Sequence, residues 1–275
     1  MPPRVVGLTG LLALLFVPAP CTPAESVHLE FESLAPQIIQ QRLESVPHSL
    51  AKREAALIAL FHQAGCEIAE QRVPHSKAPN LICTLPGTGP GEIVVGGHFD
   101  FVDEGDGAID DWSGAVMLPS LYQSLKGRPR HHRFVFVAFA AEETGMWGSQ
   151  EFVKQLSGEE KSALHAMINL ECLGTSPPKV WGSRADKQLM NAYVRAALAL
   201  QLQPQSVNVE KVGDDDSHAF LSAGIPVLTI HSVTQVTFQY LHTARDNLRA
   251  IHPADYYDAY RLAATLLALL DSTEQ

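Results

Sequence analysis

Basic residues are scarce in this sequence, and no long cluster of them is present. Lys and Arg total 20, against 30 Asp and Glu, so the formal net charge is −10 at pH 7. The densest basic run, at residues 128–133, is short and leads into an apolar segment, which indicates a solvated loop. Because binding to a phosphate backbone needs clustered Lys and Arg, we expect no nucleic-acid partner.

Cysteine is also rare, with four in 275 residues. Cys21 lies near the amino terminus, and Cys66, Cys83 and Cys172 lie in the body of the chain without any CxxC spacing. A cysteine-rich metal site is therefore excluded, and the odd count allows at most one disulfide among these three. Cys66 and Cys83 fall in segments predicted to be neighbouring strands, so they can pair in an oxidising compartment. The pairing stays open because the strand register is unknown.

Long apolar runs are missing except at the amino terminus. Residues 5–17 are apolar, follow Arg4 and precede a stretch of small residues and prolines, but the run is too short to span a bilayer. This pattern predicts a secretory signal peptide over residues 1–24. A lipid anchor on Cys21 is the alternative, which Pro20 immediately before it disfavours. We therefore expect a secreted or periplasmic protein with no membrane span.

The rest of the chain has the pattern of a folded α/β domain. Hydrophobic residues make up 46% of the sequence, enough for a large core. Short apolar runs alternate with segments whose apolar residues recur at helical spacing, which predicts one domain over residues 25–275. We expect a mixed, mostly parallel central sheet with helices on both faces. The predicted strands are 66–73, 80–85, 92–97, 133–140, 166–170 and 225–230, and the predicted helices lie within 33–65 and at 112–125, 147–156, 185–202 and 253–270.

Ionisable residues follow the apolar strands, at the position where α/β sheets bind ligands. The segments are GGHFD at 96–100, AIDDWSG at 108–114, AAEETG at 140–145, INLECLG at 168–174 and YLHTARDN at 240–247. Each segment alone is weak evidence, because a single histidine or acidic pair is usually structural. Together, nitrogen and oxygen donors from five segments suit zinc. The candidate ligands are His98, Asp110, Glu143, Glu171 and His242.

This series of segments, in this order, resembles the co-catalytic zinc exopeptidases. That family includes bacterial leucyl aminopeptidases and glutamate carboxypeptidase, with glutaminyl cyclases as relatives. The resemblance covers about residues 33–270. It implies the zinc exopeptidase fold for that span.

The resemblance also implies two zinc ions per chain. His98 and Glu171 would hold one ion, Glu143 and His242 the other, and Asp110 would bridge both. Two ions about 3.5–4 Å apart can share a water and lower its pKa towards neutrality. Three carboxylate ligands offset three of the four positive charges, and the charge that is left suits an anionic transition state.

Three further features follow from the same resemblance. Glu142 would be the general base, taking a proton from the shared water and later giving it to the leaving amine. Asp100 would accept the other ring N–H of His98 and fix its tautomer. The peptide bond between Asp110 and Asp111 would be cis.

Two positions depart from the family pattern. Glu171 stands where the family usually has Asp, and the longer side chain could alter its denticity or the metal spacing. Members often have a tyrosine directly before the last histidine, near the oxyanion, but here Leu241 has that position. The tyrosine precedes it as Tyr240, to which we assign the oxyanion role as a hypothesis. Adjacent residues on an extended segment point to opposite sides, so the shift changes where this side chain points.

Other residues near the motifs have two interpretations each. The acidic run at 214–216 either forms a loop on the substrate side or caps the following helix, where acidic residues are favoured. Trp112, Met146 and Trp147 flank candidate ligands, and they either line an apolar specificity pocket or pack beside the site.

The resemblance implies a metallo-exopeptidase, most directly an aminopeptidase that removes apolar N-terminal residues from a peptide or aminoacyl substrate, as small secreted members of the family typically do. Active-site carboxylates can hold a free amine. A carboxypeptidase would instead need Arg or Lys aimed at the terminal carboxylate, for which Arg184 and Arg245 are candidates. A glutaminyl cyclase-like acyltransferase with one zinc ion and a binding module without activity are the remaining alternatives.

Overall fold

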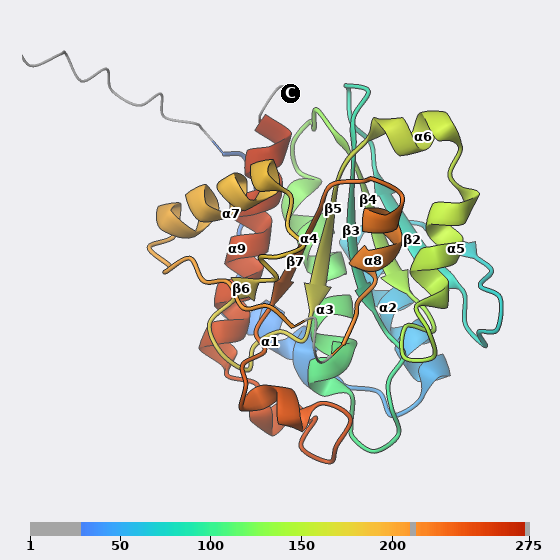
Figure 1. The fold of residues 1–275 in the computed structure, drawn as a ribbon, viewed down its shortest axis with the longest axis vertical. Coiled ribbons are helices and arrows are strands. Elements are labelled where there is room, and N and C mark those ends of the chain that lie inside the picture. The colour runs from blue at the N-terminus through green and yellow to red at the C-terminus, as the bar shows by residue number, and fades with distance from the viewer. Residues whose placement is uncertain (1–28, 210–212, 273–275) are drawn as a thin grey trace, which may run out of the picture.

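The computed structural model describes residues 29–209 and 213–272. The predicted signal peptide at 1–24, with Cys21, lies outside these residues. Figure 1 shows a central sheet with helices packed against both of its faces. The prediction of one α/β domain with a mixed, mostly parallel sheet is confirmed.

The sheet has seven strands in the order β1-β2-β4-β3-β5-β7-β6. The central strands β4, β3, β5 and β7 run parallel, whereas β1, β2 and β6 are antiparallel to their neighbours. The carboxyl ends of the parallel strands therefore meet at one edge of the sheet. The strands are Ile68–Gln71 (β1), Asn80–Leu85 (β2), Glu92–His98 (β3), Arg133–Phe139 (β4), Leu164–Glu171 (β5), Lys179–Val180 (β6) and Val227–His231 (β7).

Two groups of helices cover the sheet (Figure 1). Side chains of α2, α4, α7 and α9 join the core on one face, and those of α5 and α8 join the core on the other. β4 contributes to both, because Phe134 and Phe136 face the first group while Val135 and Val137 face the second. The helices are Pro36–Glu44 (α1), Leu50–Ala64 (α2), Ser113–Ala115 (α3), Leu118–Leu125 (α4), Trp147–Gln155 (α5), Gly158–Ala163 (α6), Lys187–Ala199 (α7), Ser217–Ser222 (α8) and Pro253–Ser272 (α9). Within the described residues, no helix has both the length and the apolar character needed to cross a membrane.

The continuous helix predicted over 112–125 is wrong. The chain forms an irregular π-helical turn at Ala108–Trp112 (η1), then the short α3, and begins again at α4. Pro119 is in the first turn of α4, a position where its missing N–H breaks no helical hydrogen bond. Hydrophobic spacing alone did not reveal this break, because the apolar residues on both sides of it face the same core.

The basic run at 128–133 is not wholly a solvated loop. Arg130 and His132 are only 4% and 2% exposed. Arg130 donates to the carbonyl of Leu125, and its guanidinium lies 3.5 Å from the carboxylate of Asp271 at the end of α9. The backbone N–H of His132 donates to the same carboxylate at 2.8 Å. Hydrogen bonds and an ion pair from this run therefore connect the segment before β4 to the carboxyl end of α9.

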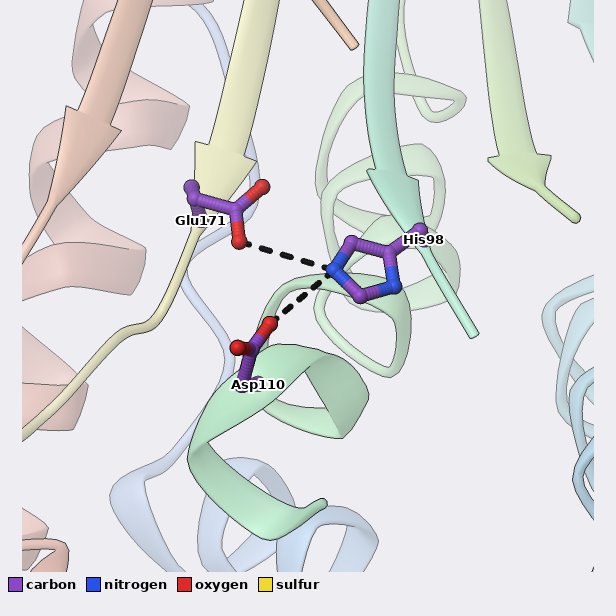
Figure 2. A group of neighbouring side chains, drawn as sticks. All are labelled: His98, Asp110 and Glu171. Atoms are coloured by element: carbon purple, nitrogen blue, oxygen red, sulfur yellow. Dashed lines mark hydrogen bonds and ion pairs between the residues drawn. The ribbon is translucent and has the colours of Figure 1, made fainter. Parts of the chain in front are cut away.

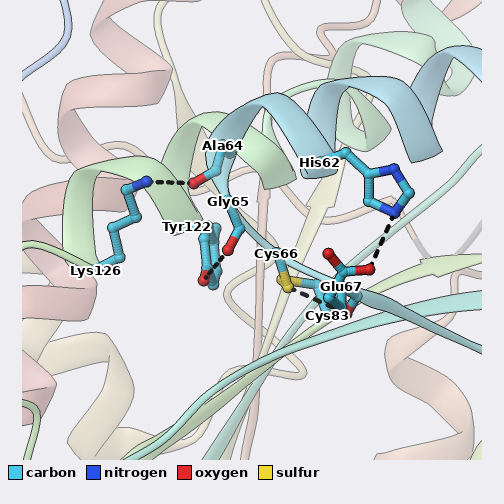
Figure 3. Close-up of a disulfide and its surroundings, with 8 residues drawn as sticks. All are labelled: His62, Ala64, Gly65, Cys66, Glu67, Cys83, Tyr122 and Lys126. Carbon is cyan, nitrogen blue, oxygen red and sulfur yellow. Dashed lines mark hydrogen bonds and ion pairs between the residues drawn. A yellow bond between two sulfur atoms is a disulfide. The ribbon is translucent and has the colours of Figure 1, made fainter.

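Figure 3 shows a disulfide between Cys66 and Cys83, the pairing that the sequence left open. Cys66 lies just before β1 and Cys83 lies within β2, with their Cα atoms 6.1 Å apart. Ile68 of β1 pairs with Cys83 in the antiparallel ladder. The bond therefore ties the edge strand β1 to its neighbour. Cys172 is free and buried.

Candidate metal centre

All five candidate ligands lie at the edge of the sheet where the parallel strands end. His98 is the last residue of β3 and Glu171 the last residue of β5. Glu143 follows β4 after a short turn, and Asp110 comes from η1, between β3 and α3. His242 lies in the segment between β7 and α9. The structure thus brings together side chains that are far apart in the sequence.

The first group contains His98, Asp110 and Glu171, which Figure 2 shows pointing toward one another. Nε2 of His98 lies 3.1 Å from Oδ1 of Asp110 and 3.5 Å from Oε1 of Glu171. The histidine side chain is 1% exposed and that of Glu171 is 16% exposed. The longer side chain of Glu171, in place of the usual Asp, therefore still reaches the other two residues.

The second group contains His242, Asp110 and Glu143. Nε2 of His242 lies 3.2 Å from Oδ2 of Asp110 and 3.0 Å from Oε2 of Glu143. Asp110 thus turns one carboxylate oxygen toward each histidine. The side chain of His242 is 55% exposed, so this group opens to solvent whereas the first group is buried.

The donor set fits divalent zinc ions. In each group the potential ligand atoms lie within 4.8 Å of one another, and they are imidazole nitrogens and carboxylate oxygens, which zinc accepts. Oε1 of Glu143 is buried and has no hydrogen-bond partner within the described residues. Burial, followed by the charge of Asp110, raises the pKa of Glu143 to about 8. A bound cation would offset this concentration of negative charge.

Asp100 has a role beyond the one predicted for it. Its carboxylate accepts the backbone N–H groups of Glu142 and Glu143, at 3.0 and 3.1 Å. Oδ1 also lies 3.5 Å from Nδ1 of His98, the nitrogen that faces away from the candidate metal position. Asp100 therefore has two roles. It lies behind His98, and it orients the turn that carries Glu142 and Glu143.

Asp111 was missed as a supporting residue. Its buried Oδ1 accepts the N–H of Gly114 and the N–H of Cys172, each at 3.0 Å. It therefore connects the turn that carries Asp110 to the end of β5, which carries Glu171. The predicted cis peptide bond between Asp110 and Asp111 is confirmed. The adjacent acidic pair in AIDDWSG was the sequence feature from which the role of Asp111 could have been predicted.

Unusual backbone conformations surround the site. Among the described residues, six non-glycine residues have a positive φ, and four of them flank the candidate ligands or include one. These are Ala141, Met146, Cys172 and His242, with φ between 50° and 60°. Such conformations cost of order 1–3 kcal/mol each and concentrate at functional sites.

Glu142 and Asp216 lie beside the ligand groups. Oε2 of Glu142 is 3.8 Å from Nε2 of His98, and its side chain is 13% exposed. Burial raises the pKa of the Glu142 carboxyl well above its usual range, and the charge of Asp216 adds to the effect. Asp216 is fully buried, and its pKa is raised to about 8, mainly by burial. Of the acidic run, Asp215 accepts the N–H of Ser217, the first residue of α8, at 3.0 Å. Asp216 is the N-cap residue of α8 but makes no capping hydrogen bond with its side chain, whose charge acts on Glu142 instead.

Among the described residues, the Tyr240 side chain makes no hydrogen bond to a candidate ligand. Within the described residues its hydroxyl makes no hydrogen bond, and its ring lies 5.1 Å from the guanidinium of Arg245. Its oxyanion role stays a prediction. Trp112 is fully buried, and Trp147, 36% exposed, lies against the ring of His75 at 5.0 Å. Neither lines the apolar pocket beside Glu171, so packing is the better interpretation of both.

Comparison with known proteins assigns this arrangement to a family. A sequence description of peptidase family M28 matches residues 80–267, a span that contains every candidate ligand and Glu142. The chain belongs to peptidase family M28. Zinc is implied by this membership, in agreement with the two ligand groups.

Relatives of this M28 chain are distant. It is 29% identical to Aminopeptidase Y of Saccharomyces cerevisiae over 192 residues, covering 66% of this chain and 35% of that protein. The chain spans about a third of the length of the relatives it matches. A solved zinc aminopeptidase from Bacillus subtilis superposes with a TM-score of 0.65 at 24% identity, covering 72% of this chain and 51% of that one. A glutaminyl cyclase from an Acidobacteriales bacterium gives 0.70 at 20% identity, covering 92% and 99%. These structural likenesses show the fold.

The two groups predict how many metal ions each variant retains. Because Asp110 belongs to both groups, Asp110→Ala should hold fewer than one zinc ion per chain. His98→Ala and His242→Ala should each hold about one, since each removes a ligand from one group. Zinc per chain would be measured by mass spectrometry of the element after dialysis against a zinc buffer.

Asp214→Ala is the control, because this exposed carboxylate belongs to neither group. It should keep two ions. If Asp110→Ala also keeps two, the bridging assignment is wrong.

Proposed function

We propose that this M28 protein is a metallo-aminopeptidase that holds two zinc ions and hydrolyses the first peptide bond of its substrate. The observation that carries the proposal is the position of Asp110, with Oδ1 toward His98 and Oδ2 toward His242. A single carboxylate that turns one oxygen toward each of two histidines is placed to bridge a pair of metal ions. Glu142 lies beside this pair and belongs to neither ligand group.

The reaction assigns a distinct task to each protein group. When bound at the two ligand groups, zinc would supply Lewis acidity and lower the pKa of the attacking water. Glu142 takes a proton from that water and returns it to the leaving amine. Burial raises the pKa of the Glu142 carboxyl, which makes its carboxylate a stronger base than a solvated one and suits it to accept a proton. Asp100 holds the backbone N–H of Glu142 and so fixes the base relative to His98.

An apolar pocket adjoins the ligand groups and supports a preference for apolar N-terminal residues. Glu171 forms one part of its wall, and its volume is about 60 Å³. Half of the other wall residues have apolar side chains, and Val233 and Leu241 are among them. A pocket of this kind favours a compact aliphatic side chain over a charged one. The full wall comprises Glu171, Trp181, Val209, Gly213, Asp214, Asp215, Thr229, His231, Val233, Phe238 and Leu241.

The charges at this pocket favour a substrate amine over a substrate carboxylate. Glu171 lines the pocket, and among the described residues no Lys or Arg does, so the charge there favours an ammonium group over a carboxylate. Arg184, a candidate for binding a terminal carboxylate, is already paired with Asp214 and stacks on Trp181 at 3.7 Å from the ring centroid. Arg245 lies over Tyr240 instead. An aminopeptidase therefore fits this site better than a carboxypeptidase.

Glutaminyl cyclisation is the second candidate function. The solved glutaminyl cyclase matches this chain over nearly the whole length of both proteins, although at 20% identity. The two ligand groups favour hydrolysis, because the cyclase interpretation needs only one zinc ion. A direct assay of both reactions separates the two candidates.

Glu142→Gln should abolish most of the activity without removing the metal. Loss of a general base lowers the rate by about 10²–10⁴-fold. We expect kcat for leucine p-nitroanilide to fall within that range while zinc per chain is unchanged. The same preparations would be tested for cyclisation of an N-terminal glutamine peptide. Full hydrolysis by Glu142→Gln would disprove the mechanism, and cyclisation without hydrolysis by the unmodified protein would replace the aminopeptidase proposal with the cyclase.

Narrowing the pocket should change substrate choice. Val233 is 5% exposed and lines the pocket, so Val233→Phe should lower kcat/KM for leucine p-nitroanilide at least tenfold, with a smaller loss for the alanine analogue. Val233→Ala should shift preference toward phenylalanine. The matched control is Val236→Phe, since Val236 is 65% exposed and outside the pocket wall. Equal losses for the leucine and alanine substrates would mean that this cavity does not hold the N-terminal side chain.

We also propose that the chain is exported to an oxidising compartment. The signal-peptide pattern and the Cys66–Cys83 disulfide both support this location. Mass spectrometry of the exported protein should find an amino terminus at Glu25 and a linked Cys66–Cys83 peptide. Recovery of the protein with an intact residue 1–24 segment and reduced cysteines would contradict export.

A further inference from the structure

Arg53 of α2 is a fully buried arginine whose guanidinium lies 4.1 Å from the centre of the Phe101 ring. Among the described residues, all of its hydrogen bonds go to backbone carbonyls. Nε donates to the carbonyl of Pro47 at 3.1 Å. Nη1 donates to that of Phe99 at 3.3 Å, and Nη2 donates to those of Asp106 and Gly107 at 2.5 and 2.9 Å. One side chain therefore joins three separate segments of backbone.

Two of these segments are the ends of the loop between candidate ligands. Phe99 directly follows His98, and Gly107 lies three residues before Asp110. By holding both ends of the 99–107 loop, Arg53 fixes the distance between these two ligands. Close packing requires glycine at 107, where φ is +55° and a Cβ atom would lie 2.8 Å from Nη2 of Arg53.

Asp246 makes the corresponding connection for the other histidine. It is 2% exposed and lies four residues after His242. Its Oδ1 accepts the backbone N–H of Ile109 at 2.7 Å, and its carbonyl accepts the N–H of Asp106 at 2.8 Å. The segment that carries His242 is thereby joined to the turn that carries Asp110.

We propose that Arg53 and Asp246 are positioning residues, one for each metal ion. Arg53 sets His98 relative to Asp110, and Asp246 sets His242 relative to Asp110. The proposal rests on the two-metal ligation proposed above. Neither residue touches the metal positions, so each acts through the backbone that carries the ligands.

The expected size of the effect follows from preorganisation. Residues that orient metal ligands without binding the metal typically change affinity about 10–100-fold. Arg53 also places a fixed positive charge behind the acidic site. Burial lowers its pKa to about 10, which leaves the guanidinium charged at neutral pH.

The test uses backgrounds that retain a single metal position. In His242→Ala only the position at His98 is left, and in His98→Ala only the position at His242. Arg53→Met should weaken zinc binding by the metal-free protein about 10–100-fold in the first background and much less in the second. Asp246→Ala should do the reverse. Affinities would be measured by competition with a chromophoric chelator, which requires no enzyme activity.

Conservative variants separate positioning from charge. Arg53→Lys keeps the charge, but an ammonium group cannot reach three carbonyl segments, so it should show most of the loss seen with Arg53→Met. Asp246→Asn keeps an acceptor oxygen for the N–H of Ile109, so it should restore most of the affinity lost in Asp246→Ala. Full zinc affinity in Arg53→Lys would disprove the positioning role of Arg53.

Arg130→Met is the matched control for loss of a buried arginine. Arg130 is 4% exposed and donates to the carbonyl of Leu125, the last residue of α4. It lies three residues before β4 begins, and therefore at the opposite end of the sheet from the site. It should lower the melting temperature without changing either zinc affinity. The positioning proposal fails if Arg130→Met weakens zinc as much as Arg53→Met, or if Arg53→Met affects both backgrounds equally or neither. If the unmodified protein binds fewer than two zinc ions, the proposed function fails first, so the two failures are distinguishable.

Discussion

The position of Asp110 is the constraint on which the rest of the site depends. Its side chain is 8% exposed, faces two histidines from distant parts of the chain, and lies among other buried acids. Carboxylates concentrated in a poorly solvated cavity are costly unless a cation offsets them. The burial, the unpartnered oxygen of Glu143 and the raised pKa values around it all follow from that arrangement. A bound cation pair would relieve these costs together.

The sheet makes this arrangement possible because four parallel strands end at one edge. His98 and Glu171 are terminal residues of adjacent strands, and Glu142 and Glu143 follow the strand on the other side of β3. The remaining ligands come from irregular segments, which the sheet does not position. Backbone hydrogen bonds to Asp100, Asp111 and Asp246 hold those segments and the acidic turn. The strand ends therefore place some of the ligands, and hydrogen bonds to buried acidic residues place the segments that carry the others.

Much of the fold was predictable from local patterns. The strand at 80–85 was predicted with its observed bounds, because an apolar run between turn signals defines a buried strand. The break between α3 and α4 was not, since both pieces pack on the same core. The candidate ligands were identified by their order at strand ends and by resemblance. The roles of Arg53 and Asp246 were not predicted, although Asp246 lies in the YLHTARDN segment, because their partners are backbone groups that only the tertiary fold brings near.

The Cys66–Cys83 disulfide has a consequence for how separate copies of the chain behave. β1 is a short edge strand, and the strand that it shields, β2, has a largely buried run from Asn80 to Leu85. An uncovered strand edge is a template on which another chain can add a strand. The covalent link keeps β1 in place even when its few ladder hydrogen bonds open. In a reducing environment, only the ladder hydrogen bonds would keep β1 on β2. If they open, the exposed edge of β2 is where two copies of the chain would associate.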